Sequence, residues 1–292
     1  MPPFQTARDI RRLLTEAGAR PRKRYGQHFL IDRHHMDKLL AAAELSREDT
    51  VIEVGAGTGS LTGLLAGRAG RVHTFEIDTT LAEIAARHVA DCPHVTLHRG
   101  DALAGQSTLA RELAAVLYEA SGPVKLVANL PYDIATPLLL ALLQADRPPV
   151  RMCFSIQREV AERLTAKPNT RDYGPAGLAC RWLAHSERLA IVPRTAFWPP
   201  PKVESALMRL IRIDMSAPQR SDARRNVELV RRFFQTRRKT LSHILTGWVG
   251  RATADSLLGD ACMDGRRRPE SLTADEWREF LHLARAKLAS AE

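Results

Sequence analysis

One turn near the middle of the chain combines an amide, a backbone carbonyl and an aromatic ring in four consecutive residues, Asn129, Leu130, Pro131 and Tyr132. Residues 125–128 before it, which are apolar after Lys125, predict a short buried strand. Pro131 must end that strand, because proline fixes φ and has no N–H for a neighbouring strand. A helix over 138–143 is predicted next, with Thr136 as its cap. The turn therefore lies at the carboxyl end of a strand, where open α/β sheets bind their ligands.

A second candidate site is a glycine-rich turn earlier in the chain. Residues 50–54 read as a buried strand, Gly55 and Gly57 follow at alternate positions, and a helix is predicted over 61–66. Glycines at this spacing let the backbone turn tightly and approach a ligand without a Cβ in the way. The turn predicts a binding site for a nucleoside or a dinucleotide.

Acidic side chains stand at the ends of the next two predicted strands, residues 71–77 and 95–97. Glu76 lies 21 positions after Gly55, where a carboxylate accepts the ribose hydroxyls of a nucleoside, and Asp101 can accept an adenine amino group. A dinucleotide would need its pyrophosphate on a helix N-terminus, whereas S-adenosylmethionine has no phosphate. Together with the Asn129 turn, these carboxylates favour S-adenosylmethionine as the cofactor and leave a dinucleotide as the alternative.

The alternation of strands and helices predicts a parallel, doubly wound sheet. Further strands are expected over 151–156, 187–192 and 205–213, after which a helical pattern follows, with an amphipathic helix over 222–244 and another over 275–288. The predicted organisation is a basic N-terminal arm over 1–24, a Rossmann-like domain over 25–213 and a small all-α domain over 214–292. Three consecutive prolines after Phe197 and Trp198 indicate a stiff connection that could hold either ring near the sheet.

The composition favours a polyanionic partner. The chain has 292 residues, and the 45% that are hydrophobic exclude a disordered protein. Its net charge of +10 points to nucleic acid as the partner. Arginine used generally on solvated faces is the alternative. The charge is concentrated, however, with eight Lys/Arg against two acids in residues 220–240. The predicted RNA-binding residues are Arg22, Lys23, Arg24, Lys202, Arg231, Arg237, Arg238 and Lys239.

The cysteine spacing indicates a reduced compartment, and the hydropathy pattern indicates that no segment spans a membrane. Four cysteines stand at positions 92, 153, 180 and 262, with no spacing for zinc or for disulfide pairing, so no metal site is predicted. The longest aliphatic run covers six residues, 138–143, far below the roughly 20 that a membrane helix needs. We expect a cytoplasmic protein, with an organellar transit peptide as a lesser alternative.

Eight segments in this order resemble the ribosomal RNA adenine dimethyltransferase family, most closely its bacterial members that modify the small subunit. They are residues 25–30, 53–59, 76–78, 100–101, 129–132, 157–164, 197–205 and 237–241. The resemblance implies a Rossmann-like methyltransferase domain with a helical C-terminal domain and S-adenosylmethionine as donor. It also implies two adjacent adenosines near the 3′ end of small-subunit (16S) rRNA as acceptors. The expected partner is a precursor of the 30S particle, and the expected state is a monomer.

By the same resemblance, six positions belong to the donor site: His28, Leu30, Gly55, Glu76, Asp101 and Asn129. A lone histidine such as His28 is otherwise more often a packing residue than a ligand or base. Two positions depart from the family pattern, since Asp133 and Ala135 stand where the family commonly has Asn and Ser. The resemblance therefore assigns no role to these two side chains.

The adenine nitrogen to be methylated is a poor nucleophile, because its lone pair is delocalised into the ring. The amide oxygen of Asn129 and the carbonyl of Leu130 could accept its two N–H bonds and align the lone pair. Tyr132 would stack on the extruded base, and Phe197 is the candidate for the opposite face. Two other functions stay open: a large-subunit (23S) adenine methyltransferase of the macrolide-resistance type, and a non-catalytic assembly factor that only binds nucleic acid.

Overall fold

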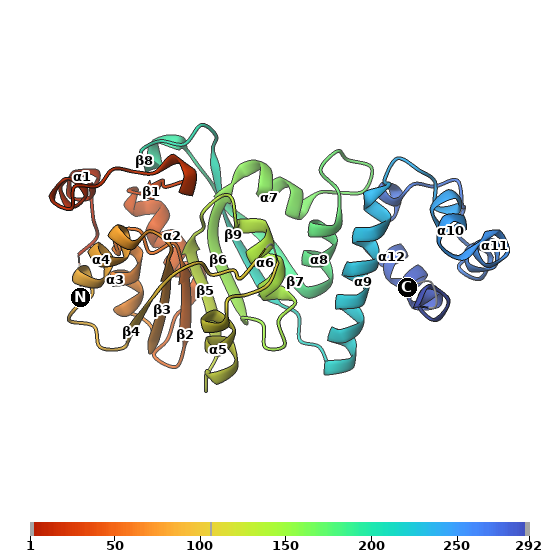
Figure 1. The fold of residues 1–292 in the computed structure, drawn as a ribbon, viewed down its shortest axis with the longest axis horizontal. Coiled ribbons are helices and arrows are strands. Elements are labelled where there is room, and N and C mark those ends of the chain that lie inside the picture. The colour runs from red at the N-terminus through yellow and green to blue at the C-terminus, as the bar shows by residue number, and fades with distance from the viewer. Residues whose placement is uncertain (1–2, 106, 290–292) are drawn as a thin grey trace. The chain divides into compact units, whose positions relative to one another are not determined.

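The computed structural model describes residues 3–105 and 107–289, which form two compact units (Figure 1). Unit 1 comprises Met1–Ala161 and Ala184–Arg212, and unit 2 comprises Glu162–Leu183 and Ile213–Glu292. The chain crosses between the units three times, and the last crossing falls one residue before the predicted boundary after residue 213. The first two crossings were not predicted, because residues 162–183 lie in the middle of the predicted Rossmann-like domain.

Unit 1 is built on a seven-stranded sheet in the order β4-β3-β2-β5-β6-β9-β7 (Figure 1). The first five are parallel: β4 (Val95–Arg99), β3 (Arg71–Glu76), β2 (Thr50–Val54), β5 (Val124–Asn129) and β6 (Arg151–Gln157). The sixth strand, β9 (Ser205–Arg212), pairs antiparallel with β6 on one side and with the edge strand β7 (Ala184–Val192) on the other. The predicted doubly wound sheet is confirmed, and this antiparallel edge extends it.

The order of the strands reverses between β2 and β5. From β2 the chain moves outward to β3 and β4 and then returns to place β5 on the other side of β2. The carboxyl ends of β2 and β5 therefore meet at a topological switch point, which is the position where such sheets open a crevice for ligands. The glycine-rich turn follows β2 and the Asn129 turn ends β5.

Helices α3 (Ser60–Ala66), α4 (Thr79–His88), α5 (Arg111–Glu119) and α6 (Ala135–Leu143) connect the parallel strands. Helix α2 (Arg33–Ala43) precedes β2, and α7 (Arg158–Thr165) follows β6. One core cluster joins side chains of β2, β3 and β5 to apolar residues of α2 and α3, among them Leu39, Leu40 and Leu65. Helix α6 begins at Ala135 and has no side-chain cap, so the predicted capping role of Thr136 is wrong. Thr136 lies one residue inside the helix.

The N-terminal segment is folded. Helix α1 (Ala7–Glu16) starts with a capping box in which Thr6 and Asp9 bond each other's backbone N–H. Its Ile10 and Leu14 are buried, and they pack with Phe29, Leu81 and Ile84 in a second core cluster. The prediction of a basic arm over 1–24 took account of the charge and missed this apolar stripe. A short 3-10 turn, η1 (Lys23–Tyr25), then leads to β1 (Phe29–Leu30).

The proline-rich connection is anchored to the N-terminal segment. After the 3-10 turn η2 (Arg194–Ala196), strand β8 (Phe197–Trp198) pairs antiparallel with β1, with Leu30 opposite Phe197 and Phe29 opposite Trp198. The backbone of Phe197 and Trp198 therefore has a strand partner, and this pairing fixes the beginning of the predicted stiff connection.

Unit 2 is helical, with α8 (Pro175–Leu183), α9 (Ala217–Gln235), α10 (Leu241–Val249), α11 (Arg251–Asp260), η3 (Pro269–Ser271) and α12 (Ala274–Ala289). Its core contains Phe233, whose ring centroid lies 4.5 Å from that of Trp248 and 5.0 Å from that of Trp277. The predicted single helix over 222–244 is two helices, because Thr240 caps the first turn of α10. No helix in the described part of the chain is long and apolar enough to cross a membrane.

Candidate functional site

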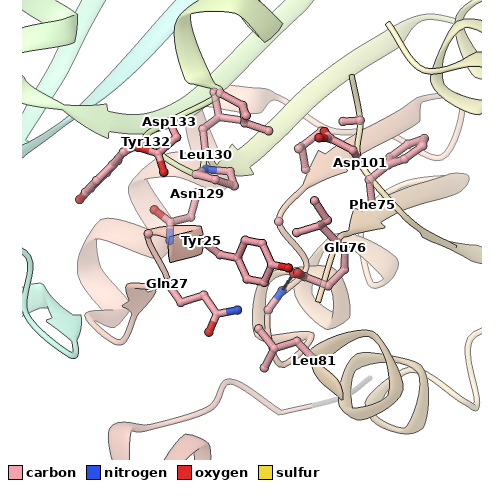
Figure 2. Close-up of a pocket in the computed structure, with 18 of the residues that line it drawn as sticks. Tyr25, Gln27, Phe75, Glu76, Leu81, Asp101, Asn129, Leu130, Tyr132 and Asp133 are labelled. Carbon is pink, nitrogen blue, oxygen red and sulfur yellow. Dashed lines mark hydrogen bonds between the residues drawn. The ribbon is translucent and has the colours of Figure 1, made fainter. Parts of the chain in front are cut away.

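A cavity of about 160 Å³ opens at the switch point of the sheet (Figure 2). Its walls come from the segment before β1, the glycine-rich turn, the ends of β3 and β4, and the Asn129 turn. In Figure 2, Asn129, Leu130 and Tyr132 lie on one side and Phe75, Glu76 and Asp101 on the other. The sheet thus joins in one cavity the two candidate sites that are 74 residues apart in the sequence, counted from Gly55 to Asn129.

The glycine-rich turn has a backbone that other residues would adopt with strain. Gly55, Gly57 and Gly59 have φ values of 88°, 57° and 87°. A Cβ on Gly57 would lie 3.1 Å from Cε1 of Phe29, and one on Gly55 would lie 3.2 Å from the ring of Pro131. The turn is therefore packed against the segment before α2 on one side and against the Asn129 turn on the other.

Glu76 is fixed at the base of this turn. Its carboxylate accepts the N–H of Gly57 at 2.8 Å and the N–H of Asp78 at 2.9 Å. Glu76 is 6% exposed, and this burial raises its pKa, whereas the two backbone hydrogen bonds act in the opposite direction. Two bonds leave the carboxylate with lone pairs to accept further donors, such as a pair of ribose hydroxyls.

Asp101 lies at the end of β4 on the same side of the cavity. Its Oδ1 accepts the N–H of Leu103 at 2.9 Å, so the side chain is held while its second oxygen can bind a ligand. Ile77 also lines the cavity and is 44% exposed, which is high for a large apolar side chain. Two carboxylates beside an exposed apolar surface suit an adenosine and disfavour a pyrophosphate.

The amide of Asn129 has a defined orientation. Its Nδ2 donates to the carbonyl of His28 at 2.8 Å, and its Oδ1 accepts the hydroxyl hydrogen of Ser155. Ser155 is completely buried on the neighbouring strand β6, and its carbonyl accepts the N–H of Leu130 at 3.2 Å. A carbonyl oxygen has two lone pairs, so Oδ1 can still accept one N–H from a ligand.

Tyr132 is held from both ends of its side chain. Its hydroxyl bonds Oγ of the buried Ser205 at 2.7 Å, and its ring stacks on His28 with centroids 5.7 Å apart. Nδ1 of His28 in turn lies 2.7 Å from the carbonyl of Pro199. Burial raises the pKa of Tyr132, so the phenol stays neutral at physiological pH and the ring can serve as a stacking surface. His28, predicted as a donor-site residue, lines the cavity, and its ring and carbonyl also support the Asn129 turn.

Two predicted site residues do not reach the cavity. Leu30 and Phe197 are 4% and 2% exposed, and both belong to the core cluster under the sheet. The pairing of β1 with β8 turns both side chains inward, so the structure does not place Phe197 where it could stack on a base. The ring of its neighbour Trp198 stacks on Phe29 instead, and Cζ of Arg11 lies over the Trp198 ring, 5.2 Å from its centroid.

The predicted cations differ in how free they are. Arg22 pairs with the buried Asp78 at 3.3 Å, Arg24 lies 4.6 Å over the ring of Tyr25, and Arg237 bonds Glu270 at 2.7 Å. These three arginines therefore have structural partners. Arg22 and Arg24 are nevertheless exposed, as are Lys202, Arg231, Arg238 and Lys239, and Arg231 lies 3.8 Å from Glu228 one helical turn away. The side chain of Lys23 lies outside the described part of the structure.

Sequence reasoning did not assign Tyr25, Gln27, Ser155 or Ser205. Tyr25 lines the cavity, and its ring points toward Glu76 in Figure 2. A weak signal existed for Ser155, which is a single hydroxyl in the apolar strand Arg151–Gln157. For metals, the described residues contain no cluster of three or more His, Cys, Asp or Glu side chains.

Comparison with known proteins adds independent evidence. The family model described as "Ribosomal RNA adenine dimethylase" matches residues 18–277. A Mycobacterium bovis protein named "Ribosomal RNA small subunit methyltransferase A" is 39% identical, with 97% of this chain and 88% of that protein aligned. A protein of the same name from Chromobacterium violaceum is 38% identical, with 90% and 94% aligned.

Two solved structures share the fold. A dimethyladenosine transferase from Plasmodium falciparum superposes with a TM-score of 0.73 at 23% identity, covering 89% of this chain and 98% of that one. The 23S rRNA methyltransferase ErmE superposes with a TM-score of 0.62 at 26% identity, covering 87% and 99%.

Proposed function

The chain belongs to the ribosomal RNA adenine dimethylase family, and from this premise we propose that it methylates N6 of two adjacent adenosines near the 3′ end of small-subunit rRNA. It is an rRNA adenine dimethyltransferase with a Rossmann-like fold. The observation that supports the proposal most directly is the oriented amide of Asn129 in one cavity with Glu76.

S-adenosylmethionine is the proposed cofactor, and when bound it supplies an electrophilic methyl group. The residues present fit it: Glu76 has lone pairs for the ribose hydroxyls, and Asp101 has a free oxygen for the adenine amino group. Gly55 and Gly57 allow the positive φ values of the turn that lines the cavity. S-adenosylmethionine contains no phosphate, so the two carboxylates in the cavity do not repel it as they would a pyrophosphate.

Asn129 and Leu130 act on the acceptor base. Oδ1 of Asn129 accepts one N–H of the adenine amino group, and the carbonyl of Leu130 accepts the other. These two bonds would favour the pyramidal nitrogen and direct its lone pair at the methyl carbon of the bound donor. As the N–C bond forms, the C–S bond would break and leave a neutral thioether, and the nitrogen would then release one proton to solvent, so no strong base is required. Because Ser155 and His28 already fix the amide, little reorganisation is needed when the base arrives.

Tyr132 supplies the stacking surface for the base, which must first leave any helix in which it is paired. The contacts of its ring and hydroxyl to His28 and Ser205 fix the plane of that surface. Stacking of this kind contributes about 1–3 kcal/mol per base. We assign the phosphate contacts to the exposed cations Lys202, Arg231, Arg238 and Lys239. The other predicted arginines are engaged more closely, by Asp78, the ring of Tyr25 and Glu270, whereas Arg231 has only an exposed pair with Glu228 at 3.8 Å.

The choice of the small subunit rests on the relatives. Proteins named for small-subunit methylation align over most of their length at 37–39% identity, whereas the 23S enzyme ErmE is 26% identical. The proposed substrate is accordingly a precursor of the small subunit in the cytoplasm, with the protein acting as a monomer in subunit maturation.

One assay tests the proposal. The protein is incubated with undermethylated small subunits, large-subunit RNA and labelled S-adenosylmethionine, and the modified adenosines are mapped. Methyl groups on two adjacent adenosines of the small subunit are expected. Label on large-subunit RNA alone would support the macrolide-resistance type of activity, and no label at all would support an assembly factor.

The Asn129→Ala variant provides the matched test of mechanism. It should still fold, with a free energy of unfolding lowered by about 1–3 kcal/mol because the buried hydroxyl of Ser155 loses its acceptor. It should lose methyl transfer by at least a hundredfold, which is the order of effect for removing one such acceptor or donor. Transfer by this variant at the wild-type rate would refute the role of Asn129.

A further inference from the structure

The N-terminal segment makes an unusual set of contacts with the glycine-rich turn through Gln5. This glutamine is 3% exposed, which is rare for its residue type. Its Nε2 donates to the carbonyl of Thr58 at 3.0 Å, and its Oε1 accepts the hydroxyl hydrogen of Thr58 at 2.5 Å. Its backbone N–H donates to Oγ of Ser60 at 3.2 Å. One residue thus bonds both ends of the segment that closes the turn.

The position of Thr58 and Ser60 makes these bonds relevant to ligand binding. Thr58 lies between Gly57 and Gly59, both with positive φ, and Ser60 begins helix α3. Glycines at such positions give the unliganded backbone many accessible conformations, whose loss opposes binding. A side chain that holds the turn from outside the cavity removes part of that loss before the ligand arrives.

Helix α1 anchors Gln5 in place. The helix begins two residues after it, and its buried Ile10 and Leu14 pack with Leu81 and Ile84 of α4. Leu81 itself lines the cavity. The same cluster contains Phe29, whose ring lies against Gly57. The apolar stripe of α1 is therefore in contact with the elements that form the wall of the donor site.

The segment after α1 reaches the same site from another direction. Arg22 pairs with the buried Asp78 at 3.3 Å, and Nε2 of Gln27 donates to Asp78 at 3.0 Å. The backbone N–H of Arg22 donates to Oε1 of Gln27 at 2.7 Å. Asp78 caps helix α4 and gives its N–H to Glu76. Residues 5–27 thus hold both the glycine-rich turn and the carboxylate predicted to bind ribose.

We propose that Gln5 is a positioning residue that holds the glycine-rich turn in its donor-binding conformation. The inference rests on the proposed function in one respect, namely that the ligand of the turn is S-adenosylmethionine. The effect is on the conformation of the turn, so it should appear in the affinity for the donor and not in the affinity for RNA.

Two substitutions separate hydrogen bonding from packing. Gln5→Ala removes the side-chain bonds and the volume, whereas Gln5→Met keeps most of the volume and removes the bonds. Arg12→Ala is the control, because Arg12 lies on the same helix with its side chain 66% exposed. Calorimetry with S-adenosylmethionine should give a Kd about tenfold higher for both Gln5 variants, the equivalent of one or two net hydrogen bonds, and an unchanged value for Arg12→Ala.

A measurement without ligand makes the outcome independent of the donor's identity. Amide hydrogen exchange at residues 57–60 should be about tenfold faster in both Gln5 variants than in the wild type, for the same energetic reason. A lower melting temperature with unchanged donor affinity would show a purely structural role and overturn the proposal. Wild-type affinity of Gln5→Met would also overturn it, since packing alone would then suffice.

Failure of the proposed function would look different. If the wild-type protein bound no S-adenosylmethionine, the assignment of the cofactor would fail, while the exchange rates at residues 57–60 would still report whether Gln5 restrains the turn. Unchanged exchange in Gln5→Ala would refute the restraint whatever ligand the cavity takes.

Discussion

A buried carboxyl group beneath the glycine-rich turn should make the stability of unit 1 depend strongly on pH. Glu53 lies on the central strand β2 and is 1% exposed. Its Oε2 accepts the hydroxyl hydrogen of the buried Thr62 at 2.6 Å. Burial raises its pKa from the ordinary value of 4.5 to about 8, against the opposing effect of hydrogen bonds from hydroxyl groups. The folded protein therefore holds a proton here at pH 7 that the unfolded chain releases.

The sign of the effect follows from this difference. Because the pKa is higher in the folded state, the stabilisation is complete below the unfolded pKa of 4.5 and is lost as the pH rises toward 8. Between pH 6 and pH 8 the unfolded chain is ionised at this site and the folded protein mostly is not. The free energy of unfolding should fall by about 2 kcal/mol over that interval because of Glu53 alone.

The test compares the wild type with Glu53→Gln, which has nearly the same volume and no titration. Urea unfolding is followed at pH 6, 7 and 8 for both proteins, and the difference between their free energies of unfolding is plotted against pH. Other titrating groups cancel in this difference. We expect it to shift by about 2 kcal/mol in favour of the variant from pH 6 to pH 8. Parallel curves for the two proteins would refute a neutral Glu53 and imply that it is ionised in the folded state.

Three further substitutions test the site itself. Ser155→Ala should lower kcat about tenfold and leave donor affinity unchanged, because the amide of Asn129 loses one of the hydrogen bonds that orient it. A higher donor Kd with normal kcat would contradict this. Tyr132→Phe keeps the ring but loses the bond to Ser205, so single-turnover rates should fall several-fold, and Tyr132→Ala should lower them far more; equal losses would argue against stacking. Gly57→Ala should lower the free energy of unfolding by about 1–2 kcal/mol through its positive φ and should weaken donor binding in calorimetry; an unperturbed variant would show that the turn adapts.

The convergence of the two candidate sites was predictable, because it follows from a general property of parallel sheets. The carboxyl ends of parallel strands lie at one edge, so a glycine-rich turn after residues 50–54 and an amide after 125–128 must come close once the strands are adjacent. Local hydrophobic runs identify such strands well, since all five residues of Thr50–Val54 are buried. Glu76 and Asp101 follow from the same reasoning.

The supporting contacts could not be predicted in this way, because each joins residues that are far apart in sequence and have no local pattern. The bond between Tyr132 and Ser205 spans 73 positions, and that between Gln5 and Thr58 spans 53. Phe197 was misplaced for a related reason: the inward direction of its side chain depends on the register of β8 against β1.

Helix α1 is a different case, because its signal was present in the sequence. Thr6 and Asp9 have the spacing of a capping box, and Ile10 and Leu14 are four residues apart on one face. The density of arginines around them led to the prediction of an arm. Charge on one face of a short helix does not exclude burial of the other.

The interleaving of the two units along the chain determines how the protein can be synthesised and divided. Helix α8 emerges from the ribosome before β7 and β9, yet its buried Trp182 donates from Nε1 to the carbonyl of Ala274 at 3.0 Å, more than 90 residues later. A fragment that ends after residue 213 would contain the whole sheet but would leave α8 without α9 and α12. Dissection at the boundary that the sequence suggests would therefore expose apolar surface and promote aggregation. A shorter catalytic fragment would also have to replace residues 162–183.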